Sequence, residues 1–265
     1  MTTPVFDLSA EVNRIRNMYS GDATQGTFNA LILGPSGSGE TRLLQTCRLP
    51  VLLHSFDPGG SKTVFDMIKS GSIVADTRFE TDSAKKPEAY KLWEKEFENL
   101  KNANAFQHFG TYCIDSFTTF IDALKNEVAR KCGRADGLLQ LQDWQVLGNV
   151  VKDVLKLCMS LPCDFIVTGH LSSEKDELSG KVVNRIATIP SLQNTLPLLF
   201  DEVYMMQADE TAKGLERYML TGNTGRFEAK TRLGSNGKFA LKEPPDIKML
   251  LKKAGRSTED KPAIA

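Results

Sequence analysis

The sequence has no excess charge of either sign, because 33 lysine and arginine residues balance 33 aspartate and glutamate residues among its 265. A uniformly basic surface is therefore excluded, and any contact with nucleic acid must come from a local patch. No stretch approaches the roughly 18 apolar residues of a membrane-spanning helix, so we expect no membrane partner. The N-terminal residues lack the apolar core of a secretory signal, which leads us to expect a cytoplasmic protein.

Cysteine is scarce and scattered along the chain. The five cysteines form no CxxC pair, and the nearest histidines do not complete a zinc-binding pattern. An odd number of scattered cysteines is typical of reduced thiols in a cytosolic protein. We therefore expect neither a disulfide framework nor a structural zinc ion.

Apolar runs alternate with helical patterns through the first two thirds of the chain. Strands are expected at 28–33, 51–56, 111–115 and 164–168, and helices at 40–47, 61–69, 87–103, 117–131 and 139–161. Strands that alternate with helices predict an α/β fold with a mostly parallel sheet and right-handed crossovers.

The pattern changes after residue 168. Residues 172–189 predict an exposed polar hairpin or loop, and 196–200 form a short apolar segment. Short strands are expected at 202–207, 217–221 and 226–231, which predicts an antiparallel extension at one edge of the sheet. We expect three parts along the chain: an N-terminal segment at 1–27, one domain at 28–254 and a flexible tail at 255–265. The N-terminal segment contains a short helix at 8–18, and the domain ends in a helix at 245–253.

A glycine-rich segment lies directly between the first expected strand and the first expected helix of the domain. It matches the phosphate-binding template GxxxxGK[ST] at every position except the lysine. Its glycines allow backbone N–H groups to turn inward around an anion, and its threonine is placed to bind Mg²⁺. The expected nucleotide-binding residues are Gly34, Pro35, Ser36, Gly37, Ser38, Gly39, Glu40, Thr41 and Arg42. The alternative, a strand-to-helix turn without a ligand, is disfavoured because strand, loop and threonine are all in register.

Glu40 stands where the template has lysine. An anion at about 4 Å from a phosphate costs on the order of a few kcal/mol at intermediate dielectric. The loop therefore indicates a triphosphate site, while position 40 indicates weak binding and impaired hydrolysis. Either a working site carries a deliberate or recent Lys-to-Glu change, or the protein is a natural pseudo-NTPase. We favour the first, because a single position of the motif departs.

Three further residues follow expected strands. Asp115 ends the strand TYCID, where an acid near a phosphate loop holds Mg²⁺ together with Thr41, although a helix N-cap is the alternative. Asp57 follows the second strand and either positions the attacking water or serves as a turn residue before proline. His170 follows the fourth strand, and it either senses the γ-phosphate or has a structural role.

Two groups of cations complete the candidate residues. Lys230 and Arg232 lie two residues apart and are either a solvated edge or cationic groups that reach a nucleotide in a neighbouring subunit. Lys175, Lys181 and Arg185 lie in the segment 172–189 among acidic residues. They are candidate DNA contacts, with a solvated loop as the alternative.

The segments GPSGSGET, SFDPGG, YCIDS, VTGH and AKTRLG occur in this order between residues 28 and 234. Together they resemble the phage-type AAA/RecA-like P-loop proteins, including the single-strand annealing recombinases with a RecA/RadA core. The resemblance implies a RecA-like fold, ATP with Mg²⁺, Asp57 as the catalytic carboxylate, Asp115 as the Walker B acid and His170 as the γ-phosphate sensor. It also implies that Lys230 and Arg232 complete the site across a subunit interface.

The resemblance further implies the partners: single-stranded DNA, a second copy of the chain in a ring or filament, and a single-strand DNA-binding protein in the cytoplasm of a bacterial host. We therefore expect a recombination protein that binds or anneals single-stranded DNA and is an ATPase in its lysine-containing form. Two alternatives stay open. One is a motor, loader or assembly factor that does not act on DNA, and the other is a pseudo-NTPase that does not hydrolyse ATP.

Overall fold

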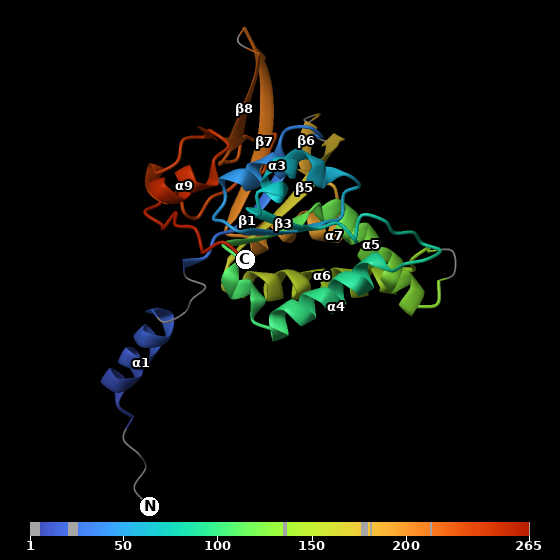
Figure 1. The fold of residues 1–265 in the computed structure, drawn as a ribbon, viewed down its shortest axis with the longest axis horizontal. Coiled ribbons are helices and arrows are strands. Elements are labelled where there is room, and N and C mark those ends of the chain that lie inside the picture. Colours follow the sequence, from blue (N-terminus) through green and yellow to red (C-terminus); the bar gives the residue numbers. More distant parts are fainter. Residues whose placement is uncertain are drawn as a thin grey trace, which may run out of the picture.

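The computed structural model describes residues 6–20, 26–134, 137–175, 180, 182–212 and 214–264. Within these residues the strands form one nine-stranded sheet in the order β3-β2-β4-β5-β1-β7-β8-β9, and β6 pairs with β5 (Figure 1). The neighbours from β3 to β7 run parallel, whereas β8 and β9 are antiparallel. The predicted α/β architecture, with a mostly parallel sheet and antiparallel C-terminal strands, is confirmed.

The strands keep the order that the sequence predicts. Their bounds are β1 Asn29–Gly34, β2 Val51–Ser55, β3 Ile73–Asp76, β4 Thr111–Asp115, β5 Asp164–Lys175, β6 Val182–Ile186, β7 Glu202–Thr211, β8 Gly214–Leu220 and β9 Lys242–Glu243.

The helices also follow the predicted order. The α-helices are α1 Leu8–Ser20, α2 Glu40–Leu43, α3 Phe65–Lys69, α4 Ala89–Asn102, α5 Phe117–Lys131, α6 Leu141–Met159, α7 Pro190–Gln193, α8 Leu196–Leu199 and α9 Ile247–Lys253. Short 3₁₀ helices lie at Leu44–Thr46, Gly60–Val64, Ala105–His108 and Ser235–Gly237.

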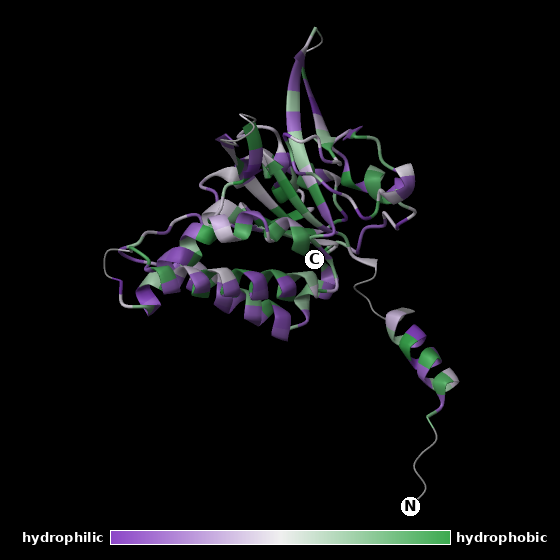
Figure 2. Cartoon of the chain, turned by 180° about the vertical axis from the view of Figure 1, so that it is seen from behind, coloured by the Kyte–Doolittle hydropathy of each residue, from purple (hydrophilic) through white to green (hydrophobic). Residues whose placement is uncertain are grey.

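The sheet separates two hydrophobic cores, since successive side chains of a strand point to opposite faces. On one face, α4, α5 and α6 pack over an aromatic cluster that includes Trp93 and Phe120. On the other face, α2 and α9 pack over a smaller core that includes Ile32 and Met219. Figure 2 shows the apolar strands between the layers and polar residues on the outer sides of the helices.

The predicted strand at 226–231 is wrong. Its backbone touches the sheet only through isolated bridges, from Phe227 to Asn184 and from Lys230 to Val203. The bridge at Val203 follows from the end of β8, because Leu220 pairs with Met205 and leaves the next part of the edge free. The short edge strands β3 and β9 were not predicted, and β5 continues beyond residue 168 into a hairpin with β6.

The C-terminal segment returns to the sheet. Lys261 donates its backbone N–H to the carbonyl of Leu49 at 2.8 Å, and Asp260 accepts a hydrogen bond from the N–H of Leu49 at 2.7 Å. Flexibility at 255–265 stays a prediction, as does the division at residues 27 and 254. In the described part of the chain, no helix has the length and apolar character needed to cross a bilayer.

Candidate functional site

The glycine-rich loop joins β1 to α2 at the carboxyl end of the parallel strands. Gly37 and Gly39 have φ angles of 83° and 105°, in the left-handed region that glycine enters without strain. Gly34 has little room for a side chain, because an ideal Cβ there would lie 2.1 Å from Oγ of Ser38 and 3.0 Å from Cβ of Met206. The loop thus has the backbone conformation that its motif predicts.

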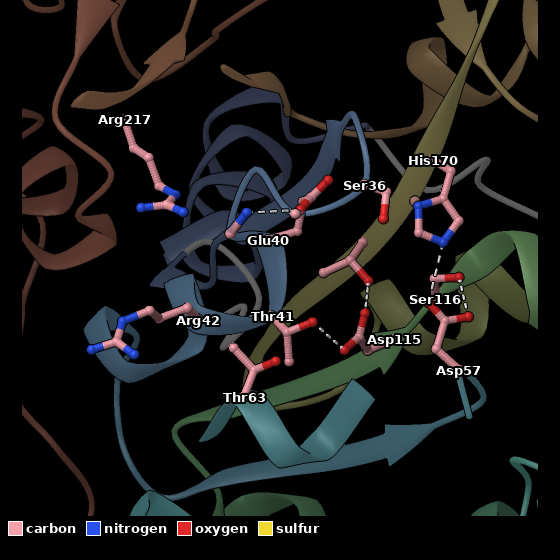
Figure 3. Close-up of a pocket in the computed structure, with 14 residues that line it drawn as sticks. Ser36, Glu40, Thr41, Arg42, Asp57, Thr63, Asp115, Ser116, His170 and Arg217 are labelled. Carbon is pink, nitrogen blue, oxygen red and sulfur yellow. Dashed lines mark hydrogen bonds and ion pairs between the residues drawn. The ribbon is translucent and has the colours of Figure 1, made fainter. Parts of the chain in front are cut away.

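Glu40 folds back onto this loop. Its Oε2 accepts a hydrogen bond from the backbone N–H of Gly39 at 3.0 Å (Figure 3). An ideal Cβ on Gly34 would lie 2.5 Å from the other carboxylate oxygen, Oε1, so the side chain fills the space beside the loop. Oε1 and the Ser38 hydroxyl are both buried without a hydrogen-bond partner among the described residues. Burial raises the pKa of Glu40, and hydrogen bonds offset only part of that rise.

Thr41 and Asp115 are hydrogen-bonded to each other at the base of the pocket. The Thr41 hydroxyl donates to Oδ2 of Asp115 at 2.7 Å, and the Thr168 hydroxyl of β5 donates to Oδ1 (Figure 3). Asp115 is only 3% exposed. Burial raises its pKa, and the two threonine hydrogen bonds offset part of the rise. The carboxylate is therefore held in a fixed orientation at the base of the pocket.

Asp57 and His170 form a second pair at the same edge. His170 Nε2 lies 3.2 Å from Oδ2 of Asp57, and Oδ1 accepts a hydrogen bond from Ser116 at 2.8 Å (Figure 3). Thr119 donates a second hydrogen bond to Oδ1 at 2.6 Å. Burial acts to raise the pKa of Asp57, but the hydrogen bond from His170 and those from the two hydroxyls outweigh it, and the net pKa is lowered. The same contact with Asp57 raises the pKa of His170.

One pocket brings these groups together because their side chains share a face of the sheet. On β5, the side chains of Ile166, Thr168 and His170 lie on one face of the sheet, because they are two residues apart. On β4, Cys113 and Asp115 lie on the same face. Both Ile166 and Cys113 belong to the core under α2. The pocket lies where these strands end beside the loop, and its lining is Ser36, Gly37, Gly39, Glu40, Thr41, Arg42, Asp57, Thr63, Asp115, Ser116, Thr168, Gly169, His170 and Arg217.

The donors at the base of the pocket suit Mg²⁺. Thr41 and Asp115 offer a hydroxyl and a carboxylate, and hard oxygen donors are what this cation prefers. Among the described residues, no group of three or more His, Cys, Asp or Glu side chains forms a metal cage. Mg²⁺ usually takes one or two carboxylates and completes its shell with water and substrate phosphates. The residues therefore fit a magnesium ion that arrives with a nucleotide.

Sequence reasoning missed several residues of the pocket. Thr168 lies two residues before His170. Two polar residues at this spacing, at the end of a buried apolar strand, are a sequence signal that could have identified it. Thr119, in the first turn of α5, lies outside the pocket lining but donates a hydrogen bond to Asp57, and no local motif marks it. Glu80 also lies outside the pocket lining. It accepts hydrogen bonds from the Ser55 hydroxyl at 2.7 Å and the Gly59 N–H at 2.9 Å, and these bonds hold the loop that carries Asp57. Arg217 comes from β8, far along the chain.

Lys230 and Arg232 lie away from the phosphate loop of their own chain. Arg232 lines a pocket with Asn29, at the start of β1, whereas the loop follows the end of β1. The Arg232 guanidinium forms an ion pair with Asp201. Burial lowers the pKa of Lys230, and the neighbouring Arg232 adds to this effect. A role in a neighbouring subunit stays a prediction.

The three candidate DNA contacts, Lys175, Lys181 and Arg185, differ in their surroundings. Lys175 is exposed at the end of β5, and Lys181 lies outside the described residues. Arg185 is half-buried, and its guanidinium lies 3.4 Å from Glu228 and 3.8 Å from Glu174. The described part of the hairpin is therefore a mixed surface in which one cation is already neutralised.

A phosphate loop, a Thr–Asp pair that suits Mg²⁺ and a carboxylate at the strand ends define a P-loop NTPase domain. The chain belongs to the AAA domain family, whose model matches residues 28–233. A search of curated proteins gave no significant match. Among solved structures, the chain is similar to a KaiC-like protein from the hyperthermophilic archaeon Pyrococcus horikoshii, with 13% identity, a TM-score of 0.40 and coverage of 73% of this chain and 77% of that one.

Proposed function

We propose that the protein is an ATP-binding, RecA-like recombination protein that binds or anneals single-stranded DNA as an oligomer, and that Glu40 impairs its ATP binding and hydrolysis. The observation that carries the nucleotide part is the hydrogen bond between Thr41 and Asp115 at the base of the loop. It pairs the hydroxyl and the carboxylate that hold Mg²⁺ in this class of protein.

The hydrolytic part of the proposal relies on Asp57. Its lowered pKa keeps the carboxylate ionised at neutral pH, so it can accept a hydrogen bond from the attacking water. The water oxygen would bond to the γ-phosphorus while the bond to the β–γ bridging oxygen breaks, which releases ADP and phosphate. His170 lines the same pocket and would contact the γ-phosphate, and Mg²⁺ would neutralise charge on the phosphate oxygens.

The continuity of β5 supports the DNA part. Thr168 and His170 contact Asp115 and Asp57, and the same strand continues to Lys175 in the exposed hairpin with β6. A change in the contact of His170 with Asp57 would therefore shift the hairpin through an unbroken strand. This would couple the state of the nucleotide to the surface proposed to contact DNA.

The test is an electrophoretic shift of single-stranded DNA by Glu40→Lys, with and without ATP and Mg²⁺, with duplex DNA of the same sequence as control. We expect an ATP-dependent shift of the single strand and, by light scattering, an ATP-dependent increase in mass. If ATP binds but no DNA shift occurs, the DNA part is rejected and the nucleotide part stands.

The ion pairs of Arg185 favour a second candidate function, an NTPase that acts with a protein partner and not on DNA. Its signature would be ATP turnover by Glu40→Lys that a protein stimulates and single-stranded DNA does not. A protein that assembles and works identically without any nucleotide would instead be a pseudo-NTPase.

A further inference from the structure

Position 40 leaves the phosphate loop without the lysine of its motif. The Glu40 carboxylate accepts a hydrogen bond from the N–H of Gly39. Without Glu40, this N–H would be free to donate to a phosphate. A nucleotide that enters this loop must displace the carboxylate, and it then meets no lysine. Binding would therefore gain from a cation that another part of the chain supplies.

The β7–β8 hairpin brings Arg217 to the loop. Arg217 and Met219 are two residues apart on β8, so their side chains lie on the same face of the sheet. Met219 is buried in the core under α2 and pairs with Met206 of β7. An ideal Cβ on Gly34 would lie 3.0 Å from Cβ of Met206, which places this part of the hairpin beside the phosphate loop.

Arg217 itself lies against the loop. An ideal Cβ on Gly39 would be 3.3 Å from Cδ and 3.4 Å from Nε of Arg217. This is the glycine whose N–H donates to Glu40. Figure 3 shows the Arg217 side chain directed toward the loop beside Glu40, while the guanidinium of Arg42 points away from Glu40.

The charge of Arg217 is available to a ligand. The side chain is exposed, and among the described residues no carboxylate forms an ion pair with it. Its cross-strand neighbour on β7 is the uncharged Ala208. A guanidinium also offers a planar set of donors that can bind two phosphate oxygens at once.

From this geometry, and resting on the proposed nucleotide site, we propose that Arg217 supplies from β8 the phosphate-binding cation that Glu40 cannot provide. The ligand is a nucleoside di- or triphosphate whose phosphates lie beside Gly39. The hairpin is then part of the nucleotide site, and the lysine of the ordinary motif and Arg217 are alternative sources of the same positive charge.

The test is a double-mutant comparison read by nucleotide binding, not by turnover. Dissociation constants for ATP, ADP and AMP with Mg²⁺ are measured by calorimetry for the parent chain and Glu40→Lys, each with and without Arg217→Gln. Arg217→Lys tests whether a cation suffices, and Arg16→Gln on α1 is the control for net charge. Circular dichroism checks that each variant is folded.

In the parent chain we expect Arg217→Gln to weaken ATP and ADP binding about tenfold or more, as the loss of a charge-assisted hydrogen bond does. Arg217→Lys should retain most of the affinity, and AMP should respond less. In the Glu40→Lys chain the same exchange should weaken binding by no more than about threefold, because a lysine already supplies the cation.

Equal losses in both backgrounds, or unchanged ATP binding by Arg217→Gln, would overturn the inference. Equal weakening of AMP and ATP would also overturn it, because Arg217 would then bind the nucleoside part. If the parent chain binds no nucleotide while Glu40→Lys does, the inference fails and the proposed function stands. If neither chain binds, the proposed function fails as well.

Discussion

Replacing Glu40 by lysine should convert a weak nucleotide site into a tight one. Removing an anion at about 4 Å from a phosphate gains roughly 1–4 kcal/mol, between the limits for bulk water and for a protein surface. A new charge-assisted hydrogen bond adds about 1.5–3 kcal/mol. Together the two gains amount to about 2.5–7 kcal/mol. Because Glu40 is only half-buried, we take a value near the lower end, about 2.7 kcal/mol, which is about a hundredfold in the dissociation constant.

The assay is titration with ATP and Mg²⁺, in which Glu40→Gln separates the two contributions. Glutamine removes the negative charge without adding a cation, so its affinity should fall between those of the parent and Glu40→Lys. Burial raises the pKa of Glu40, so the carboxyl is protonated, and the repulsion lost, as pH falls through that raised value. The parent should therefore bind ATP more tightly in mild acid, and Glu40→Gln should not share this trend. An unchanged dissociation constant for Glu40→Lys would refute the reasoning.

Three further exchanges test the site and the fold. Asp57→Asn in the Glu40→Lys chain should abolish ATP turnover with little change in ATP affinity, and an NMR titration should show a lower His170 pKa, because the contact with Asp57 is what raises it. Arg48→Ala should destabilise the chain by roughly 3–5 kcal/mol in urea unfolding, since the buried Asp164 loses a two-point ion pair. Phe120→Ala should cost about 3–5 kcal/mol in the same assay, because the ring is fully buried.

The pH dependence of the Asp57–His170 pair has a definite sign. The lowered pKa of Asp57 means that its stabilising contribution is present above the ordinary carboxyl pKa and lost in acid. The raised pKa of His170 means that its contribution is complete below the ordinary imidazole pKa and lost as pH rises through the raised value. The stability difference between the parent and Asp57→Asn should therefore be largest between about pH 4 and 6.5. A difference that falls neither in acid below this range nor as pH rises through the raised His170 pKa would contradict the pairing.

Leu141→Ala is the matched control for the core exchange. Leu141 is 89% exposed, so its truncation should change the free energy of unfolding by no more than about 0.5 kcal/mol. An equal loss at Phe120 and Leu141 would mean that the aromatic core does not carry the stability assigned to it.

The site was predictable where motif and strand end coincide. Gly34, Thr41 and Asp115 could be placed because a buried apolar run fixes the strand and the strand fixes where its next residue lies. Thr168 and Arg217 could not, for different reasons. Thr168 is one hydroxyl in an apolar strand, and its role depends on which strand lies beside it. Arg217 depends on the register of a hairpin that carries no turn motif strong enough to set it from sequence.

The fold was predictable in its centre and less so at its edges. Strands buried on both faces, such as β4, are continuous apolar runs, whereas β3 and β9 are short and have few apolar residues. The segment 226–231 alternates like a strand, but only one part of it reaches a free edge of β7. Local pattern cannot decide this, because edge pairing depends on where the neighbouring strand ends.

The cost of burying Asp115 separates the two explanations of Glu40. A carboxylate that is 3% exposed and has a raised pKa destabilises a domain without a ligand, where an apolar side chain of similar size would be better. Two threonine hydroxyls nevertheless hold this carboxylate in one orientation, and a separate pair of hydroxyls orients Asp57. Such groups suit a pocket that a cation and a polyphosphate occupy. The arrangement therefore favours a working nucleotide site altered at one position over a pseudo-NTPase with no use for its acids.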